Sequence, residues 1–513
     1  MRLADVTLPT LDYLALGPAV IVLVAALIGL LAEVLLPRSL RRTAQLSLAF
    51  GSVAVAGVMV LAQAGTYVVT AGGSVVADGP GLFAQGTIVA LTLAAIALIA
   101  EREVDPSGDA FAPQAAVAPG SAAELAVLTK GVTATEVYPL TLFATGGMLM
   151  LATAGDLLIL FVAIEVLSLP LYVLTAMARR RRLISQEAAL KYFILGAFSS
   201  AFLLFGSALL YGFSGSLDLA AIGASLSGTV ERDPLLYAGA ALMGVGLLFK
   251  VGAAPFHSWS PDVYQGAPTP ITAYMASVTK VAAFVALLRV FYVALGGIRW
   301  DWQPVLALVA VISMIVGTVV ALTQTDIKRL LAYSSVAHAG FILVGVSAAT
   351  NEGTSSVLFY LLAYGFSTLG AFGVVTLVRD SAGEATHLSQ WAGLGKRSPL
   401  VAGLFGLFLL AAAGIPLTSG FTAKFAVFAA AVDGDIGWLV VVGVLASAVA
   451  AFFYVRVIVL MFFTEPAVDG PRVVVPSGFT VAALSAAAAL TLLLGLFPQP
   501  ILDVAETAST FLL

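Results

Sequence analysis

Runs of apolar residues, each long enough to cross a bilayer, recur along almost the whole chain and decide what it can fold into. A membrane-spanning helix needs roughly 20 mostly apolar residues. About 14 segments meet this requirement, at roughly 14–36, 45–64, 84–101, 137–154, 156–176, 189–213, 237–258, 270–295, 303–323, 329–349, 355–378, 399–429, 435–463 and 476–497. Lipid offers no hydrogen bonds to an exposed backbone, so each segment is expected to be helical. We therefore predict an all-α polytopic membrane protein.

The composition agrees with this class and excludes several others. Hydrophobic residues make up 60% of the 513 residues and charged residues only 10%, against about 45–50% and about 25% in soluble proteins. The sequence has no cysteine, three histidines, a net charge of -4 and no Walker-type phosphate-binding motif. These features argue against thiolate metal sites, cysteine-ligated iron–sulfur clusters, nucleotide hydrolysis and nucleic-acid binding. We expect the lipid bilayer to surround most of this chain.

The basic residues predict how the chain lies in the membrane. They gather in alternate connections, at Arg38, Arg41 and Arg42, at Arg179 to Arg182, at Lys328 and Arg329, and at Arg379, Lys396 and Arg397. The intervening connections carry mainly acids, such as Asp78, Asp156, Glu352 and Asp433. The positive-inside rule places the arginine-rich connections in the cytoplasm and both termini outside. The abundance of Ala, Gly and Val, and of Arg over Lys, suggests a bacterium with a high-GC genome. We therefore expect the protein to lie in a bacterial plasma membrane.

Two of the expected spans carry helix-breaking residues in their interior. Span seven contains Gly252 and Pro255, and span twelve contains Gly414 and Pro416. A proline frees the carbonyl four residues earlier, here that of Val251 or Ala412, and hydrocarbon tolerates a free carbonyl only where protein or a wet cavity receives it.

Two broken spans lying five apart predict an internal repeat of five helices. Because five is odd, the second copy must be inverted in the membrane, as in many transporters. The alternative is that the prolines only kink helices for packing.

Five titratable residues lie inside the expected spans. Glu165, Lys250, Lys280 and His338 lie near the centres of spans five, seven, eight and ten, and Lys424 follows the break in span twelve. A charge at mid-bilayer costs about 2.5–3.5 kcal/mol, so such residues usually serve a function. Because they come from five different helices, we expect them to form a lateral row across the bundle.

This row suggests proton translocation. Glu165 and Lys250 could form an ion pair, and Lys250 would release its proton if Glu165 moved away or became neutral. Lys280 and His338 could accept the proton, and Lys424 would be the last station. Connecting waters could be held by hydroxyl groups nearby, at Tyr333, Ser334, Ser335, Thr418, Ser419 and Thr422. The alternatives are a static ion pair, lysines that extend to an interface and a packing histidine. A proton is favoured over sodium because lysine offers no oxygen ligand.

Two stretches resemble a known family. FKVGAAPFHSWSPDVYQGAPTPITAYMASVTK (Phe249 to Lys280) is similar to the signature of the subunit N family of respiratory NADH–quinone oxidoreductase, complex I. TQTDIKRLLAYSSVAHAGFILVG (Thr323 to Gly345) resembles the segment shared by the antiporter-like subunits of that enzyme and the Mrp cation/proton antiporters. The resemblance covers roughly residues 137–463 well.

The resemblance implies two inverted five-helix repeats. They divide the chain into an N-terminal three-helix segment with a polar loop (1–136), a first repeat (137–295), a second repeat (303–463) and a C-terminal helix (464–513). The resemblance also implies a charged axis used in pumping. Glu165, Lys250, Lys280 and Lys424 occupy the matching motif positions, and His338 lies in the shared segment. The implied partners are the sister antiporter-like subunits and small membrane subunits of complex I. The resemblance also implies that this chain holds no redox cofactor, that FMN and iron–sulfur clusters lie in other subunits, and that quinone binds elsewhere. Three alternatives stay open: an Mrp-type sodium/proton antiporter, a related complex fed by ferredoxin or a deazaflavin, and a structural membrane subunit that only anchors its neighbours.

Overall fold

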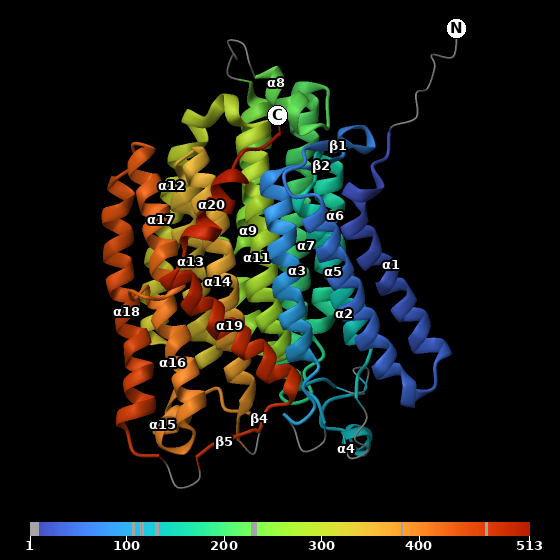
Figure 1. The fold of residues 1–513 in the computed structure, drawn as a ribbon, viewed down its shortest axis with the longest axis vertical. Helices are drawn as coiled ribbons and strands as arrows, with labels where there is room; N and C mark the ends of the chain where they lie inside the picture. Colours follow the sequence, from blue (N-terminus) through green and yellow to red (C-terminus); the bar gives the residue numbers. More distant parts are fainter. Residues whose placement is uncertain are drawn as a thin grey trace.

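Long helices packed side by side make up most of the molecule (Figure 1). The computed structural model describes residues 10–104, 108–112, 114, 117–128, 133–226, 233–380, 383–466 and 470–512. Its principal helices are α1 (Tyr13–Leu35), α2 (Arg38–Ala62), α3 (Gly79–Ile99), α5 (Val137–Ala152), α6 (Leu157–Thr175), α7 (Arg182–Ser214), α9 (Pro234–Val251), α10 (Trp259–Gly266), α11 (Thr269–Arg289), α12 (Arg299–Thr323), α13 (Ile327–Ser347), α14 (Asn351–Leu377), α16 (Pro399–Ala413), α17 (Ser419–Asp433), α18 (Trp438–Phe463) and α19 (Gly478–Leu496). In these ranges twelve helices are long and apolar enough to cross a membrane, and the shorter apolar helices α5 and α16 complete the predicted fourteen spans.

Short elements lie between the spans. The helices are α4 (Ala122–Leu128), α8 (Leu219–Ser225), α15 (Leu394–Arg397) and α20 (Gln499–Thr507). Strands β1 (Val68–Thr70) and β2 (Val75–Ala77) form an antiparallel pair, and β3 (Val378–Asp380) pairs antiparallel with both β4 (Gly383–Glu384) and β5 (Arg472–Val473). Helix α4 lies in the predicted polar loop. The sequence did not predict the strands, because each has only two or three residues and finds its partner through the fold.

Aspartates set where several helices begin. The side chains of Asp12, Asp78, Asp156, Asp218, Asp233 and Asp326 each accept hydrogen bonds from main-chain amides in the first turn of the following helix. A helix leaves its first four N–H groups without a partner inside the helix, and an aspartate at this position satisfies one or two of them. Several acids that mark the connections in the sequence are therefore structural caps.

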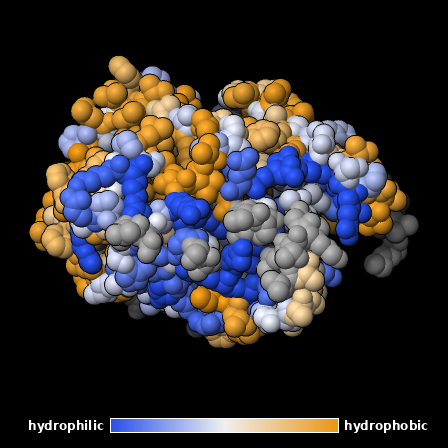
Figure 2. Space-filling view, turned by 90° about the horizontal axis from the view of Figure 1, so that it is seen from below, coloured by the Kyte–Doolittle hydropathy of each residue, from blue (hydrophilic) through white to orange (hydrophobic). Residues whose placement is uncertain are grey.

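Both ends of the described chain lie on one face of the bundle. The Thr70 hydroxyl donates to the carbonyl of Thr10 over 3.0 Å, and the amide of Leu512 donates to Asp78 over 3.2 Å. The arginine-rich connections lie at the opposite face, where hydrophilic residues spread across the surface and hydrophobic residues lie at its edges (Figure 2). An even number of spans places both ends together as predicted. The assignment of the arginine-rich face to the cytoplasm stays a prediction.

A buried ion pair anchors the C-terminal end of the chain. The Arg289 guanidinium, at the end of α11, donates to both carboxylate oxygens of Asp78, at 2.9 and 2.6 Å. Asp78 also caps α3 and accepts the amide of Leu512, and the Phe511 ring lies 5.1 Å from the Arg289 guanidinium carbon. Both charged side chains are almost completely buried. The pair therefore joins α3, α11 and the chain end.

The two predicted breaks are confirmed. Helix α9 ends at Val251, where Gly252 adopts a left-handed φ of 72°, and α10 resumes the span at Trp259. Helix α16 ends at Ala413, Gly414 has a φ of 83°, and α17 follows. The break falls in the fourth span both of the series α5, α6, α7, α9–α10, α11 and of the series α12, α13, α14, α16–α17, α18. The residue boundaries of the two repeats stay a prediction. Every residue of α11 is buried, so it lies at the centre of the bundle.

Candidate functional site

Lys424 is held at the break of span twelve. Its ammonium donates to the carbonyls of Ala412 and Ala413, at 3.1 and 2.9 Å, and to the Ser447 hydroxyl at 2.9 Å. The sequence predicted that Pro416 would free the Ala412 carbonyl, and here a lysine receives it. The break therefore creates an acceptor site for a cation inside the bundle.

Among the described residues, the groups in contact with this ammonium are neutral. The ring of Phe341 lies 4.6 Å from it, and Lys424 is 5% exposed. No carboxylate of the described residues lies within 4.0 Å of it. A buried cation without a counter-ion is expensive, so these neutral acceptors and the aromatic ring are what hold the ammonium in the bundle.

Lys250 lies in the last turn of α9, before the break of span seven. Its ammonium donates to the hydroxyl of Ser168 on α6 over 2.6 Å, and Ser168 donates in turn to the Ile164 carbonyl. Glu165 lies one turn from Ser168 on the same helix, and residues three apart face the same side. One oxygen of Glu165 is buried and accepts no hydrogen bond, and no ion pair within 4.0 Å joins the described Glu165 and Lys250. The structure therefore brings the two residues to neighbouring positions without direct contact.

The polar backbone at this first break is satisfied by side chains. The Trp259 indole donates to the Phe249 carbonyl over 3.0 Å, and the Ser313 hydroxyl accepts the amide of Ala254 at 2.9 Å. These bonds let the chain cross the bundle without a continuous helix, as an apolar environment requires.

Lys280 connects the two series of helices. Its ammonium, on α11, donates to the main-chain carbonyl of Ser335 on α13 over 2.6 Å. The Tyr364 hydroxyl donates to the Ser335 hydroxyl over 2.8 Å, and the Tyr364 ring lies 5.4 Å from the ammonium. Lys280 is only 3% exposed. A second buried cation is thus held by a carbonyl and an aromatic ring.

His338 lies on the same helix, less than one turn beyond Ser335. Its Nδ1 is 2.8 Å from the Tyr360 hydroxyl and its Nε2 is 3.4 Å from the Tyr454 hydroxyl, which is also hydrogen bonded to Ser334. A neutral imidazole donates through one nitrogen and accepts through the other, and two hydroxyl partners suit either tautomer.

A small cavity continues from His338 toward the second break. It measures about 20 Å³, and its lining includes Ser334, His338, Tyr364 and Ala412, whose carbonyl also binds Lys424. One water molecule needs about 10–15 Å³ and two to four polar partners. The cavity therefore has room for a water between the imidazole and the lysine site.

The structure divides the predicted row into two groups. Lys280, His338 and Lys424 gather around α13, whereas Glu165 and Lys250 lie together on α6 and α9. No hydrogen bond between described residues links Lys250 to Lys280. Within the described ranges, no three His, Cys, Asp or Glu side chains are placed to hold a metal ion.

Several participating hydroxyls were not singled out from the sequence. They are Ser168, Tyr360, Tyr364, Ser447 and Tyr454. Tyr360 and Tyr364 stand four residues apart in an apolar helix, which places both on one face and was an available signal.

Some of the residues that the sequence suggested as holders of connecting waters lie at the site, and others lie elsewhere. Ser334 and Ser335 join the site. Tyr333 instead packs against His257, with 6.1 Å between ring centroids, and the Thr418 hydroxyl donates to the Ile415 carbonyl.

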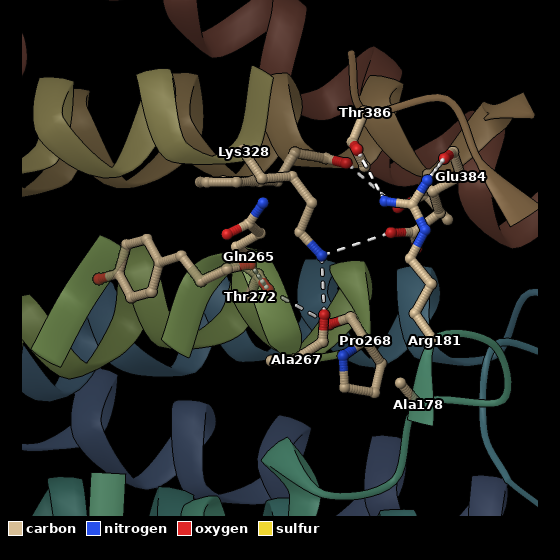
Figure 3. Close-up of polar contacts among 12 residues, drawn as sticks. Ala178, Arg181, Gln265, Ala267, Pro268, Thr272, Lys328, Glu384 and Thr386 are labelled. Atoms are coloured by element: carbon tan, nitrogen blue, oxygen red, sulfur yellow. Dashed lines mark hydrogen bonds and ion pairs between the residues drawn. The ribbon is translucent and has the colours of Figure 1, made fainter. Parts of the chain in front are cut away.

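A further polar cluster fixes the beginning of α13 at the arginine-rich face. The Lys328 ammonium donates to the Ala267 carbonyl over 2.7 Å and to Glu384 over 3.3 Å, and Arg181 donates to Thr386 over 2.8 Å. In Figure 3 the ends of Lys328 and Arg181 converge beside Glu384. Burial alone would raise the pKa of the Glu384 carboxyl, but the Lys328 and Arg379 charges hold this pKa below its ordinary value. The cluster ties α13, which carries Ser335 and His338, to the turn before α11.

Comparison with known proteins identifies the family to which this chain is similar. Residues 154–450 match a family described as NADH:quinone oxidoreductase/Mrp antiporter, transmembrane. NADH-quinone oxidoreductase subunit N of Rhodococcus opacus is 59% identical, and the match covers 99% of this chain and 98% of that protein. A chain of respiratory complex I from Thermus thermophilus with bound aureothin is 33% identical with a TM-score of 0.76, over 95% of this chain and 99% of that one. A chain of the Mrp complex from a Dietzia species, 23% identical with a TM-score of 0.79 over 97% of both chains, shares the fold.

The chain thus has the fold of the antiporter-like transmembrane proteins, and within this fold a lysine is buried beside each of the two helix breaks. This is the class that the sequence predicted. Within it, the full-length similarity to curated relatives shows that the chain belongs to the NADH-quinone oxidoreductase subunit N family.

Proposed function

We propose that this chain translocates protons as subunit N in the membrane arm of an NADH–quinone oxidoreductase. It would do so without an electron carrier of its own, driven by quinone reduction in other subunits that hold FMN and iron–sulfur clusters. The proposal draws on the names of the relatives and on the chemistry of the buried lysines. Its partners would be the sister antiporter-like subunits and small membrane subunits, and its location the bacterial plasma membrane with the arginine-rich face toward the cytoplasm.

The observation that carries the proposal is the sequence of proton-exchanging groups around α13. A proton leaving Lys280 finds the Ser335 and Tyr364 hydroxyls beside it, and His338 follows on the same helix. Imidazole can take a proton at one nitrogen and release another from the opposite one. A water in the adjoining cavity would carry the proton on to Lys424.

Glu165 would act as the electrostatic switch of the first group. In the present arrangement the Lys250 ammonium is bound to Ser168, and the Glu165 carboxylate lies close by without a hydrogen bond at one oxygen. Rotation of Glu165 toward Lys250 would create an ion pair and favour the protonated lysine, and rotation away would favour proton release.

The test uses the intact complex isolated through a tag on this chain and reconstituted into liposomes. We expect Lys250→Ala and Lys424→Ala to lower both proton uptake and NADH–quinone turnover about a hundredfold or more, because removal of a proton-transfer group typically costs about two to four orders of magnitude. Lys396→Ala, at an exposed surface pair, is the matched control. Unchanged pumping in both core variants would refute the mechanism. A small particle without flavin that exchanges sodium for protons would instead identify an Mrp-type antiporter.

A further inference from the structure

Two buried polar atoms without a hydrogen-bond partner lie on one face of α6, within the part of the chain that the structure describes. One is a carboxylate oxygen of Glu165, and the other is the hydroxyl oxygen of Tyr172, whose side chain is only 6% exposed. Residues seven apart lie about two turns apart on the same side of a helix. A carboxylate accepts hydrogen bonds and a tyrosine hydroxyl donates one, so the two unpaired atoms are complementary.

The direction of helical side chains brings the Tyr172 hydroxyl toward Glu165. Side chains of an α-helix tilt toward its N-terminus, and Glu165 precedes Tyr172 on α6. Between them on this face lies Ser168, which accepts the Lys250 ammonium at 2.6 Å. Ser168 and the Glu165 charge both lie close enough to act on the Tyr172 hydroxyl. Glu165, Ser168 and Tyr172 therefore form one polar stripe beside Lys250.

The ring of Tyr172 is fixed by the neighbouring helix α7. It packs edge-on against Tyr192 and Phe193, with ring centroids 4.7 and 5.7 Å away. Gly196 makes room for the hydroxyl, because a Cβ added there would lie 2.1 Å from the Tyr172 oxygen. A phenylalanine would fill the same space without burying an unpaired O–H group, which is costly. Packing alone therefore does not account for a tyrosine at this position.

We propose that Tyr172 is a positioning residue for Glu165, and that its hydroxyl is the second partner of the Glu165 carboxylate. Glu165 then has two alternatives: it pairs with Lys250, or it turns along α6 and accepts a hydrogen bond from Tyr172. The second position compensates the buried carboxylate while Lys250 is without its counter-ion. The inference rests on the role of Glu165 in the proposed function.

The test uses the intact complex isolated through a tag on this chain and reconstituted into liposomes. Tyr172→Phe keeps the ring and removes only the hydroxyl. Without a second partner Glu165 stays at Lys250, so proton uptake should fall about tenfold, the factor that corresponds to the loss of one hydrogen bond to a charged group. Tyr192→Phe is the matched control, because it removes the hydroxyl of the other ring in the same aromatic pair. It should leave proton uptake unchanged.

A double variant distinguishes positioning from packing. Glu165→Gln leaves no charged group for Tyr172 to hold, so adding Tyr172→Phe to it should lower proton uptake no further. Infrared difference spectra of the complex give a second measurement. The carboxylate band that Glu165→Gln removes should shift in Tyr172→Phe and stay in place in Tyr192→Phe.

Four outcomes would overturn the proposal. They are normal proton uptake in Tyr172→Phe, an equal loss in Tyr192→Phe, losses that add in the double variant, and a carboxylate band that Tyr172→Phe does not move. The lysine variants separate this inference from the proposed function. If Lys250→Ala and Lys424→Ala leave pumping intact, both conclusions are wrong. If these variants stop pumping and Tyr172→Phe pumps normally, only the role of Tyr172 is wrong.

Discussion

The buried pair between Asp78 and Arg289 allows a quantitative test of how the C-terminal end of the chain is held. Asp78→Asn keeps a side chain that can cap α3, since asparagine caps helices as well as aspartate does. It removes the negative charge, however, and leaves the Arg289 guanidinium buried without a counter-ion. The amide of Leu512 also loses a charged acceptor.

Breaking a buried ion pair by removing one partner costs about 3–5 kcal/mol. At about 1.4 kcal/mol for each factor of ten, local opening becomes roughly 100-fold to 4,000-fold more frequent. Replacing both charges relieves the unpaired arginine. Asp78→Asn combined with Arg289→Met should therefore recover much of the loss, because the double variant leaves no buried charge without a counter-ion.

Hydrogen–deuterium exchange of the intact complex in nanodiscs measures this opening at the amide of Leu512 and in the last turn of α11. Asp233→Asn is the control, because Asp233 also caps a helix and has no ion pair among the described residues. The reasoning is refuted if Asp78→Asn leaves these exchange rates unchanged. A double variant that opens more often than the single variant would also refute it.

Two further changes test the second break and the polar cluster at α13. Gly414 has a φ of 83°, and a Cβ added there would lie 2.9 Å from Cδ of Lys424. Gly414→Ala should therefore displace the lysine side chain and lower proton pumping several-fold in liposomes. Gly403→Ala is the control and should leave pumping unchanged, because a Cβ at Gly403 meets no atom within 4 Å. Burial opposes ionisation of Glu384, but the cationic side chains around it, Lys328 among them, hold its pKa below the usual value of about 4.3. The ionised Glu384 carboxylate therefore stabilises the folded protein at neutral pH, and this stabilisation disappears as the pH falls through the lowered pKa. Thermal unfolding measured against pH should show this acid-dependent loss of stability, and Glu384→Gln should remove it.

The spans and both breaks followed from the sequence because each rests on local information. Twenty apolar residues predict a helix in lipid wherever they occur, and a Gly–Pro pair interrupts a helix regardless of its neighbours. The sequence also contains the cation that binds the freed Ala412 carbonyl, because Lys424 lies in the same span, beyond the break. The resemblance to the subunit N family added motif positions for Glu165, Lys250, Lys280 and Lys424.

The contacts of the buried charges did not follow from the sequence. Glu165 and Ser168 lie on the same face of α6, so the fine placement of α6 along α9 decides which of them Lys250 contacts. The two hydroxyls that flank His338 come from α14 and α18, and only the packed bundle brings them to one imidazole. Such placement is set by side-chain packing between helices, which hydropathy does not record.

The acceptor of Lys280 is a main-chain carbonyl, and this has a mechanical consequence. No substitution at Ser335 can delete that oxygen, so its position depends only on where α13 lies. The hydrogen bond from Lys280 is 2.6 Å long, and it weakens steeply if the donor and acceptor atoms move about 1 Å farther apart. The length of this hydrogen bond therefore depends directly on how α11 and α13 are placed, and a slide of one helix past the other would lengthen or break it.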